Sequence, residues 1–190
     1  MTVTDSGYAR PGVGLISVGW MGKLHSRAYQ AIPLVYPELK IRPRFVHAAD
    51  TAPDRAEYAR EVLGYEKAGT DYRDVLADPE VDVVSICAPN MLHREIGVAA
   101  ARAGKPFWIE KPVGRDASET AEVAAAARAG GVNLHLVDAD RVSFSFGPLG
   151  DARVQKGALV VFVELACRLE GGQRDVVLSN TLATLLTPQD

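Results

Sequence analysis

Cysteine and histidine are scarce in this chain, and their scarcity excludes whole classes of protein. The 190 residues include two cysteines and four histidines. Cys87 and Cys167 lie in apolar segments far apart in the sequence, which is typical of buried free thiols in a reducing compartment. So few candidate ligands predict neither a disulfide framework nor a metal site.

Long apolar runs and an excess of basic charge are also absent. No run approaches the roughly 20 residues that span a bilayer, and residues 1–10 lack the basic-then-apolar order of a signal peptide. We therefore expect a disordered leader over residues 1–10, no membrane partner and a cytoplasmic protein. The net charge of -3 provides no basic footprint, so nucleic acid is not expected as a partner.

The remaining composition is that of an ordinary globular protein. Hydrophobic residues make up 47% and charged residues 24% of the chain, both usual values for a folded domain. A chain of 190 residues can form one full domain with a core and part of a second.

An apolar run that ends in a glycine turn stands near the start of the chain. Residues 13–18 form a short run that predicts a buried strand, and Gly19-Trp20-Met21-Gly22 leads at once into a helical pattern. A strand, a glycine turn and a helix together aim backbone N–H groups at a phosphate. The fingerprint G-x-G-x-x-G is one glycine short, because Ser17 stands at its first position. Taken alone, the stretch fits a nucleotide site and a plain turn equally well.

The second expected strand ends in an acidic residue. Residues 45–49 are mostly apolar, and Asp50 follows them directly. A carboxylate at this place can accept both ribose hydroxyls of an adenosine, and it repels a 2′-phosphate, which favours NAD over NADP. The alternative is that Asp50 caps the helix expected from about residue 54 onward.

Strands and helices alternate along the rest of the first 138 residues. Further strands are expected at 81–86, 107–109 and 134–137, and helices at 24–35, 53–63, 70–77, 92–103 and 118–129. Pro33 and Pro37 should break the first of these helices. Such alternation predicts an α/β fold, a doubly wound parallel sheet covered by helices on both faces.

The polar motifs all follow expected strands. Gly19 comes after the first strand and Asp50 after the second, and Pro89-Asn90 and Glu110-Lys111 follow two later strands. Ligands of open α/β sheets bind at the carboxyl ends of the strands. This alignment favours a nucleotide-binding cleft.

Four short motifs follow one another in a fixed order. They are Gly19-Trp20-Met21-Gly22 with Leu24-His25, Ala88-Pro89-Asn90-Met91-Leu92-His93, Ala103-Gly104-Lys105-Pro106 and Glu110-Lys111-Pro112. In this order the chain resembles the Gfo/Idh/MocA family of oxidoreductases, which includes glucose–fructose oxidoreductase and inositol dehydrogenase. The resemblance implies an NAD(P)-binding Rossmann domain over 11–138. It also implies hydride transfer between NAD(P) and a secondary alcohol of a sugar, inositol or related polyol.

The resemblance assigns residues to the cofactor. Asp50 would meet the ribose, and Glu110 would lie near the nicotinamide ribose. The pyrophosphate would lie over Gly19, Trp20 and Met21, and the segment that would pass beneath the cofactor contains Ala88, Pro89, Asn90 and His93.

The resemblance assigns the chemistry to Lys111, which would contact both substrate and cofactor. An ammonium beside a developing alkoxide lowers the barrier electrostatically and assists proton transfer. The alternatives are a surface lysine before a proline turn at Lys111 and a helix cap at His93. His25 is expected to be a packing or surface residue.

The chain after about residue 138 is short for this family. Members usually continue into an α+β substrate domain that supplies another acid–base group, whereas residues 139–190 form a short, incomplete segment, a β-rich remnant of such a domain. Its β-prone runs at 158–163 and 176–178 and its apolar run at 181–186 need to be covered by other parts of the protein. Either the Rossmann domain or a second subunit could cover them, so a homo-oligomer is one arrangement.

Two functions are therefore open. The first is an NAD-dependent sugar or polyol oxidoreductase with a reduced second domain, which Lys111 and Asp50 favour. The second is a truncated, non-catalytic dinucleotide-binding relative with a role in sensing or assembly, which Ser17 and the short second half favour.

Overall fold

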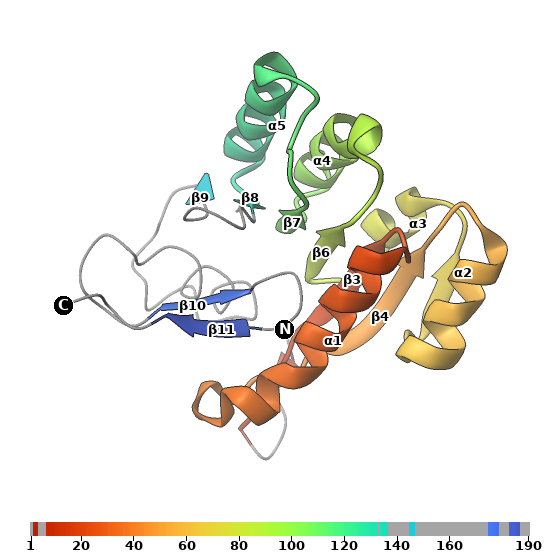
Figure 1. Cartoon of the computed structure of the whole chain (residues 1–190), viewed down its shortest axis with the longest axis vertical. Coiled ribbons are helices and arrows are strands. Elements are labelled where there is room, and N and C mark those ends of the chain that lie inside the picture. The colour runs from red at the N-terminus through yellow and green to blue at the C-terminus, as the bar shows by residue number, and fades with distance from the viewer. Residues whose placement is uncertain are drawn as a thin grey trace.

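One largely parallel sheet organises the chain. The computed structural model describes residues 7–132 with their side chains, together with the backbone of five short strand segments outside that range. The sheet has the strand order β5-β4-β3-β6-β7-β8-β9, and most of it can be followed in Figure 1. Its strands are β3 (Gly12–Ile16), β4 (Arg44–Ala49), β5 (Lys67–Gly69), β6 (Val83–Ile86), β7 (Phe107–Ile109), β8 (Leu134–Leu136) and β9 (Ser145–Phe146).

The strand order creates a crevice at the centre of the sheet. From β3 the chain builds outward through β4 and β5, then returns to place β6 on the other side of β3. All pairs from β5 to β8 are parallel, and β9 runs antiparallel to β8. The loops after β3 and β6 therefore leave the same edge of the sheet in opposite directions, which is the switch point where such folds bind ligands.

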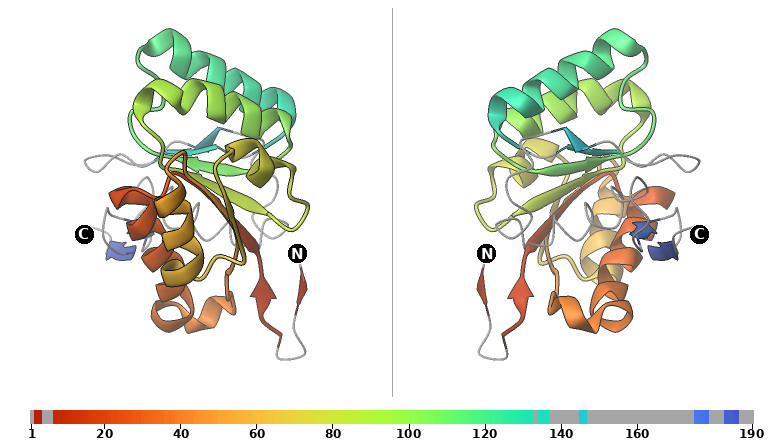
Figure 2. Two further views of the ribbon diagram at one scale, coloured as in Figure 1. Left: turned by 90° about the vertical axis from the view of Figure 1, so that its right-hand side faces the viewer. Right: turned by 90° about the vertical axis from the view of Figure 1, so that its left-hand side faces the viewer.

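Helices cover both faces, as Figure 2 shows. On one face lie α1 (Trp20–Val35), α2 (Pro53–Tyr58) and the continuing π-helical turn η2 (Ala59–Leu63). On the other lie α3 (Tyr72–Ala77), α4 (His93–Arg102) and α5 (Ala117–Gly130). The predicted doubly wound α/β fold is confirmed.

Alternation along each strand sorts the side chains between the two faces. On β7, Phe107 and Ile109 belong to the core beneath α4 and α5, whereas Trp108 belongs to the core beneath α1. On β6, Val84 faces the first core and Val83 the second. Ser85 is fully buried on the α1 face, where its hydroxyl lies 2.8 Å from the Tyr29 hydroxyl. One polar side chain thus stands in an otherwise apolar strand.

The helix boundaries depart from expectation at one proline. Helix α1 runs through Pro33 and ends at Val35, so the predicted break at Pro33 is wrong. Pro33 lacks the N–H that would bond the carbonyl four residues earlier, but only two helical residues follow it, so the helix loses one backbone hydrogen bond close to its end and is not broken. The short strand β5 was not among the expected strands, because its three residues carry no apolar run.

Part of residues 1–10, for which the sequence predicts a disordered leader, forms a pair of short strands. Strand β1 (Thr2–Val3) pairs antiparallel with β2 (Ala9–Arg10). The Ala9 N–H donates to the Lys40 carbonyl, and the Arg42 N–H donates to the Ala9 carbonyl, each at 2.9 Å. These bonds attach residues 7–10 to the segment that precedes β4.

Two strands are described near the end of the chain. Strand β10 (Asp175–Leu178) pairs antiparallel with β11 (Ala183–Leu186), so the β-prone run at 176–178 lies in a strand and most of the apolar run at 181–186 forms its partner. The run at 158–163 lies outside the described residues. Among the helices that the structure describes, none is both long enough and apolar enough to cross a membrane.

Candidate cofactor site

The glycine turn between β3 and α1 forms the centre of the site. Ser17 has a φ of 73°, the left-handed conformation that suits the first glycine of the fingerprint. A Cβ on Gly22 would lie 2.2 Å from the Ser17 carbonyl oxygen, so the helix packs on the turn only with glycine there. A Cβ on Gly19 would meet nothing closer than the Ser17 hydroxyl oxygen at 3.9 Å. The chain's own packing therefore does not require Gly19, and the open space beside it suits the close approach of a phosphate.

The N-terminus of α1 fits an anion. Gly19 is the N-cap, no side chain caps the helix there, and the first turn contains no acidic residue. Unsatisfied N–H groups and the helix dipole make such an end electropositive. Trp20 is 66% exposed and Met21 is partly exposed at this end. The geometry fits the pyrophosphate of a dinucleotide.

Asp50 is positioned directly after β4 and holds the glycine turn. One carboxylate oxygen accepts the Val18 N–H at 2.7 Å, and the other accepts the Ala52 N–H at 3.0 Å. The Ser17 hydroxyl lies 3.5 Å from the first of these oxygens. The N-cap of α2 is Ala52, without a side-chain capping bond, so Asp50 is not that helix's cap. Asp50 instead fixes the glycine turn from the carboxyl end of β4.

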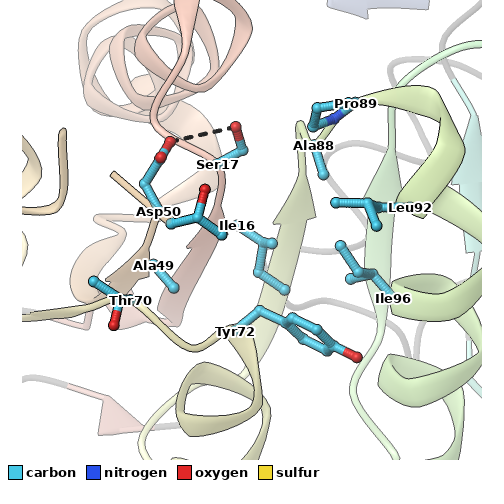
Figure 3. Close-up of a pocket in the computed structure, with 11 residues that line it drawn as sticks. Ile16, Ser17, Ala49, Asp50, Thr70, Tyr72, Ala88, Pro89, Leu92 and Ile96 are labelled. Carbon is cyan, nitrogen blue, oxygen red and sulfur yellow. Dashed lines mark hydrogen bonds between the residues drawn. The ribbon is translucent and has the colours of Figure 1, made fainter. Parts of the chain in front are cut away.

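A pocket opens between the carboxyl ends of β3, β4 and β6 (Figure 3). The side chains of Asp50 and Ser17 lie on one side of it, and Ala88 and Pro89 lie on the opposite side. Tyr72 closes a further side, and its hydroxyl donates to Glu95 at 2.7 Å. Partial burial, followed by the neighbouring Glu95 carboxylate, raises the pKa of Tyr72 to about 12. The remaining lining residues are Ile16, Ala49, Thr51, Thr70, Leu92 and Ile96.

Two loops are joined beside this pocket through the carbonyl of Pro112. The Asn90 side-chain amide donates to that carbonyl at 2.7 Å, and His93 Nδ1 lies 2.7 Å from the same oxygen. His93 Nε2 lies 2.7 Å from the Ala88 carbonyl. The ring is 1% exposed and does not cap α4, whose N-cap is Leu92. Because backbone carbonyls lie at both nitrogens of this buried ring, His93 ties the two loops together.

Glu110 and Lys111 follow β7 with contrasting environments. Glu110 is 6% exposed, and its carboxylate accepts a hydrogen bond from His25 Nε2 at 2.8 Å. Lys111 is exposed, and none of the ion pairs among residues 7–132 involves it. A buried, paired carboxylate thus stands beside an accessible ammonium at the carboxyl end of β7.

His25 is the site residue that the sequence analysis missed. It is expected as a packing or surface residue, yet it bridges Glu110 and Ser85, with Nδ1 3.1 Å from the Ser85 hydroxyl oxygen. Burial alone would lower the pKa of His25, but Cys87 and Glu110 outweigh it and raise the pKa to about 10. The signals that could have found it are its place one turn after Gly22 and the lone hydroxyl of Ser85 in the most apolar strand.

The fold and the site together define a class of protein. A doubly wound sheet, a glycine turn at the switch point and an acid after the second strand are the features of a dinucleotide-binding Rossmann domain. Residues 12–137 match the family model described as "Oxidoreductase family, NAD-binding Rossmann fold" (GFO_IDH_MocA). That range is more than half of the chain, and the chain belongs to the Gfo/Idh/MocA family, with NAD as the cofactor of its Rossmann domain.

Similar proteins agree with this assignment. The chain is 42% identical over 111 residues to levoglucosan dehydrogenase of Pseudarthrobacter phenanthrenivorans, covering 57% of this chain and 28% of that protein. It is 31% identical over 103 residues to myo-inositol 2-dehydrogenase of Thermotoga maritima, covering 53% of this chain and 28% of that protein. A solved structure of levoglucosan dehydrogenase in complex with NADH and L-sorbose matches with a TM-score of 0.64 at 37% identity, covering 68% of this chain and 34% of that one. The chain thus spans about a third or less of the length of these relatives.

Proposed function

We propose that this chain forms the cofactor-binding part of an oxidoreductase that moves a hydride between NAD and a secondary alcohol of a sugar, inositol or related polyol. One observation carries the proposal. The exposed Lys111 stands beside the buried Glu110 at the same sheet edge as the Asp50-held glycine turn. The relatives named above act on levoglucosan and inositol, which supports a polyhydroxylated substrate.

The proposed binding roles follow from the geometry. The open space at Gly19 and the N–H groups of Trp20 and Met21 bind the pyrophosphate. The Asp50 carboxylate, whose oxygens already accept two backbone N–H groups, accepts ribose hydroxyls and repels a 2′-phosphate. Ala88 and Pro89 form the opposite wall of the pocket, and Asn90 holds the neighbouring turn through Pro112.

The proposed chemistry rests on Lys111. The bound nicotinamide supplies the hydride acceptor or donor. Lys111 lies at the substrate hydroxyl: as the neutral amine it accepts the hydroxyl proton during oxidation, and as the ammonium it stabilises the developing alkoxide and returns that proton during reduction. Glu110 lies beside it, contacts His25 and keeps the turn in place.

A cofactor titration tests the proposal. Quenching of Trp20 fluorescence on addition of NADH or NADPH reports binding at the start of α1. Any quenching that remains in a Trp20→Phe variant comes from Trp108. We expect NADH to bind more tightly than NADPH. Binding of neither cofactor would contradict the proposal.

A turnover assay with a panel of sugars and cyclitols follows. We expect Lys111→Ala to bind NADH as the wild type does but to lose activity by about 10²-fold or more. Binding without turnover on any alcohol, unchanged by Lys111→Ala, favours the second candidate, a non-catalytic dinucleotide-binding relative. Ser17, in a backbone conformation that glycine normally occupies, is the observation that favours that candidate.

A further inference from the structure

A chain of polar side chains crosses the buried α1 face of the sheet. The Tyr29 hydroxyl lies 2.8 Å from the Ser85 hydroxyl oxygen, which lies 3.1 Å from His25 Nδ1. His25 Nε2 then lies 2.8 Å from the Glu110 carboxylate. Trp108 packs edge-on against the His25 ring, with the ring centroids 6.1 Å apart. These hydrogen-bonded side chains connect α1, the middle of β6 and the end of β7.

Packing alone does not explain these residues. Burying a carboxylate and an imidazole is expensive unless both are paired, and apolar side chains of similar volume would serve a core equally well or better. Here the side chains of His25 and Glu110 are only 14% and 8% exposed. The contact between His25 and Glu110 fixes the orientation of the Glu110 carboxylate, whereas an apolar contact would allow several orientations.

The turn Glu110-Lys111-Pro112 is held from two sides. On the far side, Asn90 and His93 both approach the Pro112 carbonyl at 2.7 Å. On the near side, the contact of His25 with the Glu110 carboxylate is the side-chain anchor. Lys111 is the exposed residue between these anchors, so the direction of its side chain depends on both.

We propose that His25 is a positioning residue for the nicotinamide end of the site, acting through Glu110 to place the Glu110-Lys111-Pro112 turn. This inference rests on the proposed function, since it assigns Glu110 to the nicotinamide half of the cofactor. It separates His25 from Asp50 and Gly19, which serve the adenosine and pyrophosphate half. The two halves can therefore be tested with different ligands.

The test compares NADH with ADP, which contains only the adenosine and pyrophosphate. His25→Leu removes the anchor, and we expect it to weaken NADH binding about tenfold, as for a lost charge-assisted hydrogen bond, while ADP binding stays within about twofold. His25→Gln, whose amide can still donate to Glu110, should restore most of the NADH affinity. Thermal unfolding of each variant reports any general loss of structure.

Ser26→Ala is the matched control. Ser26 is fully buried on the same helix, and its hydroxyl bonds to the Gly22 carbonyl and lies 3.2 Å from the Tyr65 hydroxyl, away from Glu110. It should leave the ratio of NADH to ADP affinity unchanged.

A double-mutant cycle shows whether His25 acts through Glu110. Glu110→Gln alone should weaken the binding of NADH but not of ADP, and adding His25→Leu to Glu110→Gln should weaken NADH binding little further. Equal weakening of NADH and ADP by His25→Leu, or no change in their ratio, overturns the inference while leaving the proposed function intact. If His25→Leu does not fold, the ratio of NADH to ADP affinity is measured in His25→Gln and Glu110→Gln instead. An unchanged ratio in Glu110→Gln then overturns the inference. Wild-type chain that binds neither ligand contradicts the proposed function and the inference together.

Discussion

Ser17 occupies a backbone conformation that a glycine would adopt without strain. At φ 73° its Cβ crowds the following carbonyl, which costs about 1–2 kcal/mol for most residues. The neighbouring Asp50 carboxylate, 3.5 Å from the Ser17 hydroxyl, recovers little of this because the contact is long. The turn nevertheless forms, so the fingerprint is structurally complete although one of its glycines is replaced.

Replacing Ser17 with glycine should therefore stabilise the domain. We expect Ser17→Gly to raise the free energy of unfolding by about 1 kcal/mol, measured by urea denaturation. Gly64→Ala is the mirror control. Gly64 has a φ of 84° and open space around its Cβ position, so alanine there should lower stability by a similar amount. A loss of stability in Ser17→Gly would show that the serine hydroxyl matters more than its backbone strain.

The protonation of His25 makes part of the stability depend on pH. The pKa of His25 is about 10 in the folded chain, above its usual value of 6.5, so the folded state binds more protons between these values. The stabilisation is fully present below about pH 6.5 and is lost as the pH rises through about 10.

Urea denaturation of wild type and His25→Gln at several pH values checks this. The wild-type advantage in unfolding free energy should shrink steadily from pH 6.5 to pH 10, because the variant has no titrating ring there. Tyrosines and lysines remote from His25 that also titrate in this range are common to both proteins and cancel in the difference. An advantage that stays constant with pH would contradict the raised pKa.

At the scale of elements, the junction of β3 and α1 separates a packing glycine from a binding glycine. Gly22 lies against the backbone of Ser17, whereas Gly19 faces open space and has a φ of -70° that any residue adopts. The two glycines are three residues apart, and the fingerprint already predicts close approach to a phosphate at Gly19 and tight helix packing at Gly22. The path of the helix across the turn agrees with both roles.

Alanine should therefore impair stability at Gly22 and cofactor binding at Gly19. We expect Gly22→Ala to lower the free energy of unfolding by about 2 kcal/mol or more, because backbone must shift to relieve the contact. Gly19→Ala should change stability by less than about 0.5 kcal/mol yet weaken NADH binding, since its methyl group fills the space for the pyrophosphate. Chemical denaturation and fluorescence titration of both variants provide the test. Normal NADH affinity in Gly19→Ala would place the pyrophosphate elsewhere.

At the scale of the whole molecule, the site is assembled from loops that leave one edge of the sheet. The segments around Gly19, Asp50, Asn90 and Glu110 are far apart in the chain and meet only because β4, β3, β6 and β7 are neighbours in the sheet. A ligand that spans these loops binds only the folded state. Its binding free energy therefore adds to the stability of the domain.

NADH should therefore stabilise the domain, and more than NADPH does. At a hundred times its dissociation constant, NADH should raise the free energy of unfolding by about 2.7 kcal/mol. NADPH at the same concentration should raise it less, because the Asp50 carboxylate opposes a 2′-phosphate. Thermal unfolding with each cofactor measures the difference between stabilisation by NADH and by NADPH. Asp50→Asn should make this difference smaller. Equal stabilisation of the wild type by both cofactors would argue against a ribose role for Asp50.

Local sequence was sufficient for the framework of this protein. Apolar runs, capping residues and glycines predict β3, β4, β6 and β7 and the helices between them, because hydrophobic period and turn chemistry are properties of neighbouring residues. The same reasoning placed Asp50 and Lys111 after strands, and the carboxyl ends of parallel strands lie along one edge. The motifs at Pro89-Asn90 and Glu110-Lys111-Pro112 indicated the family without knowledge of the fold.

Tertiary structure alone decided which polar groups become partners. The pairing of His25 with Glu110 joins residues 85 positions apart and depends on the packing of α1 against β6 and β7. His93 engages the carbonyls of Ala88 and Pro112 instead of capping its own helix, and the three-residue strand β5 exists because β4 offers it an edge. Such choices carry no local signal, because a buried hydrogen bond is selected by what the completed fold places within reach.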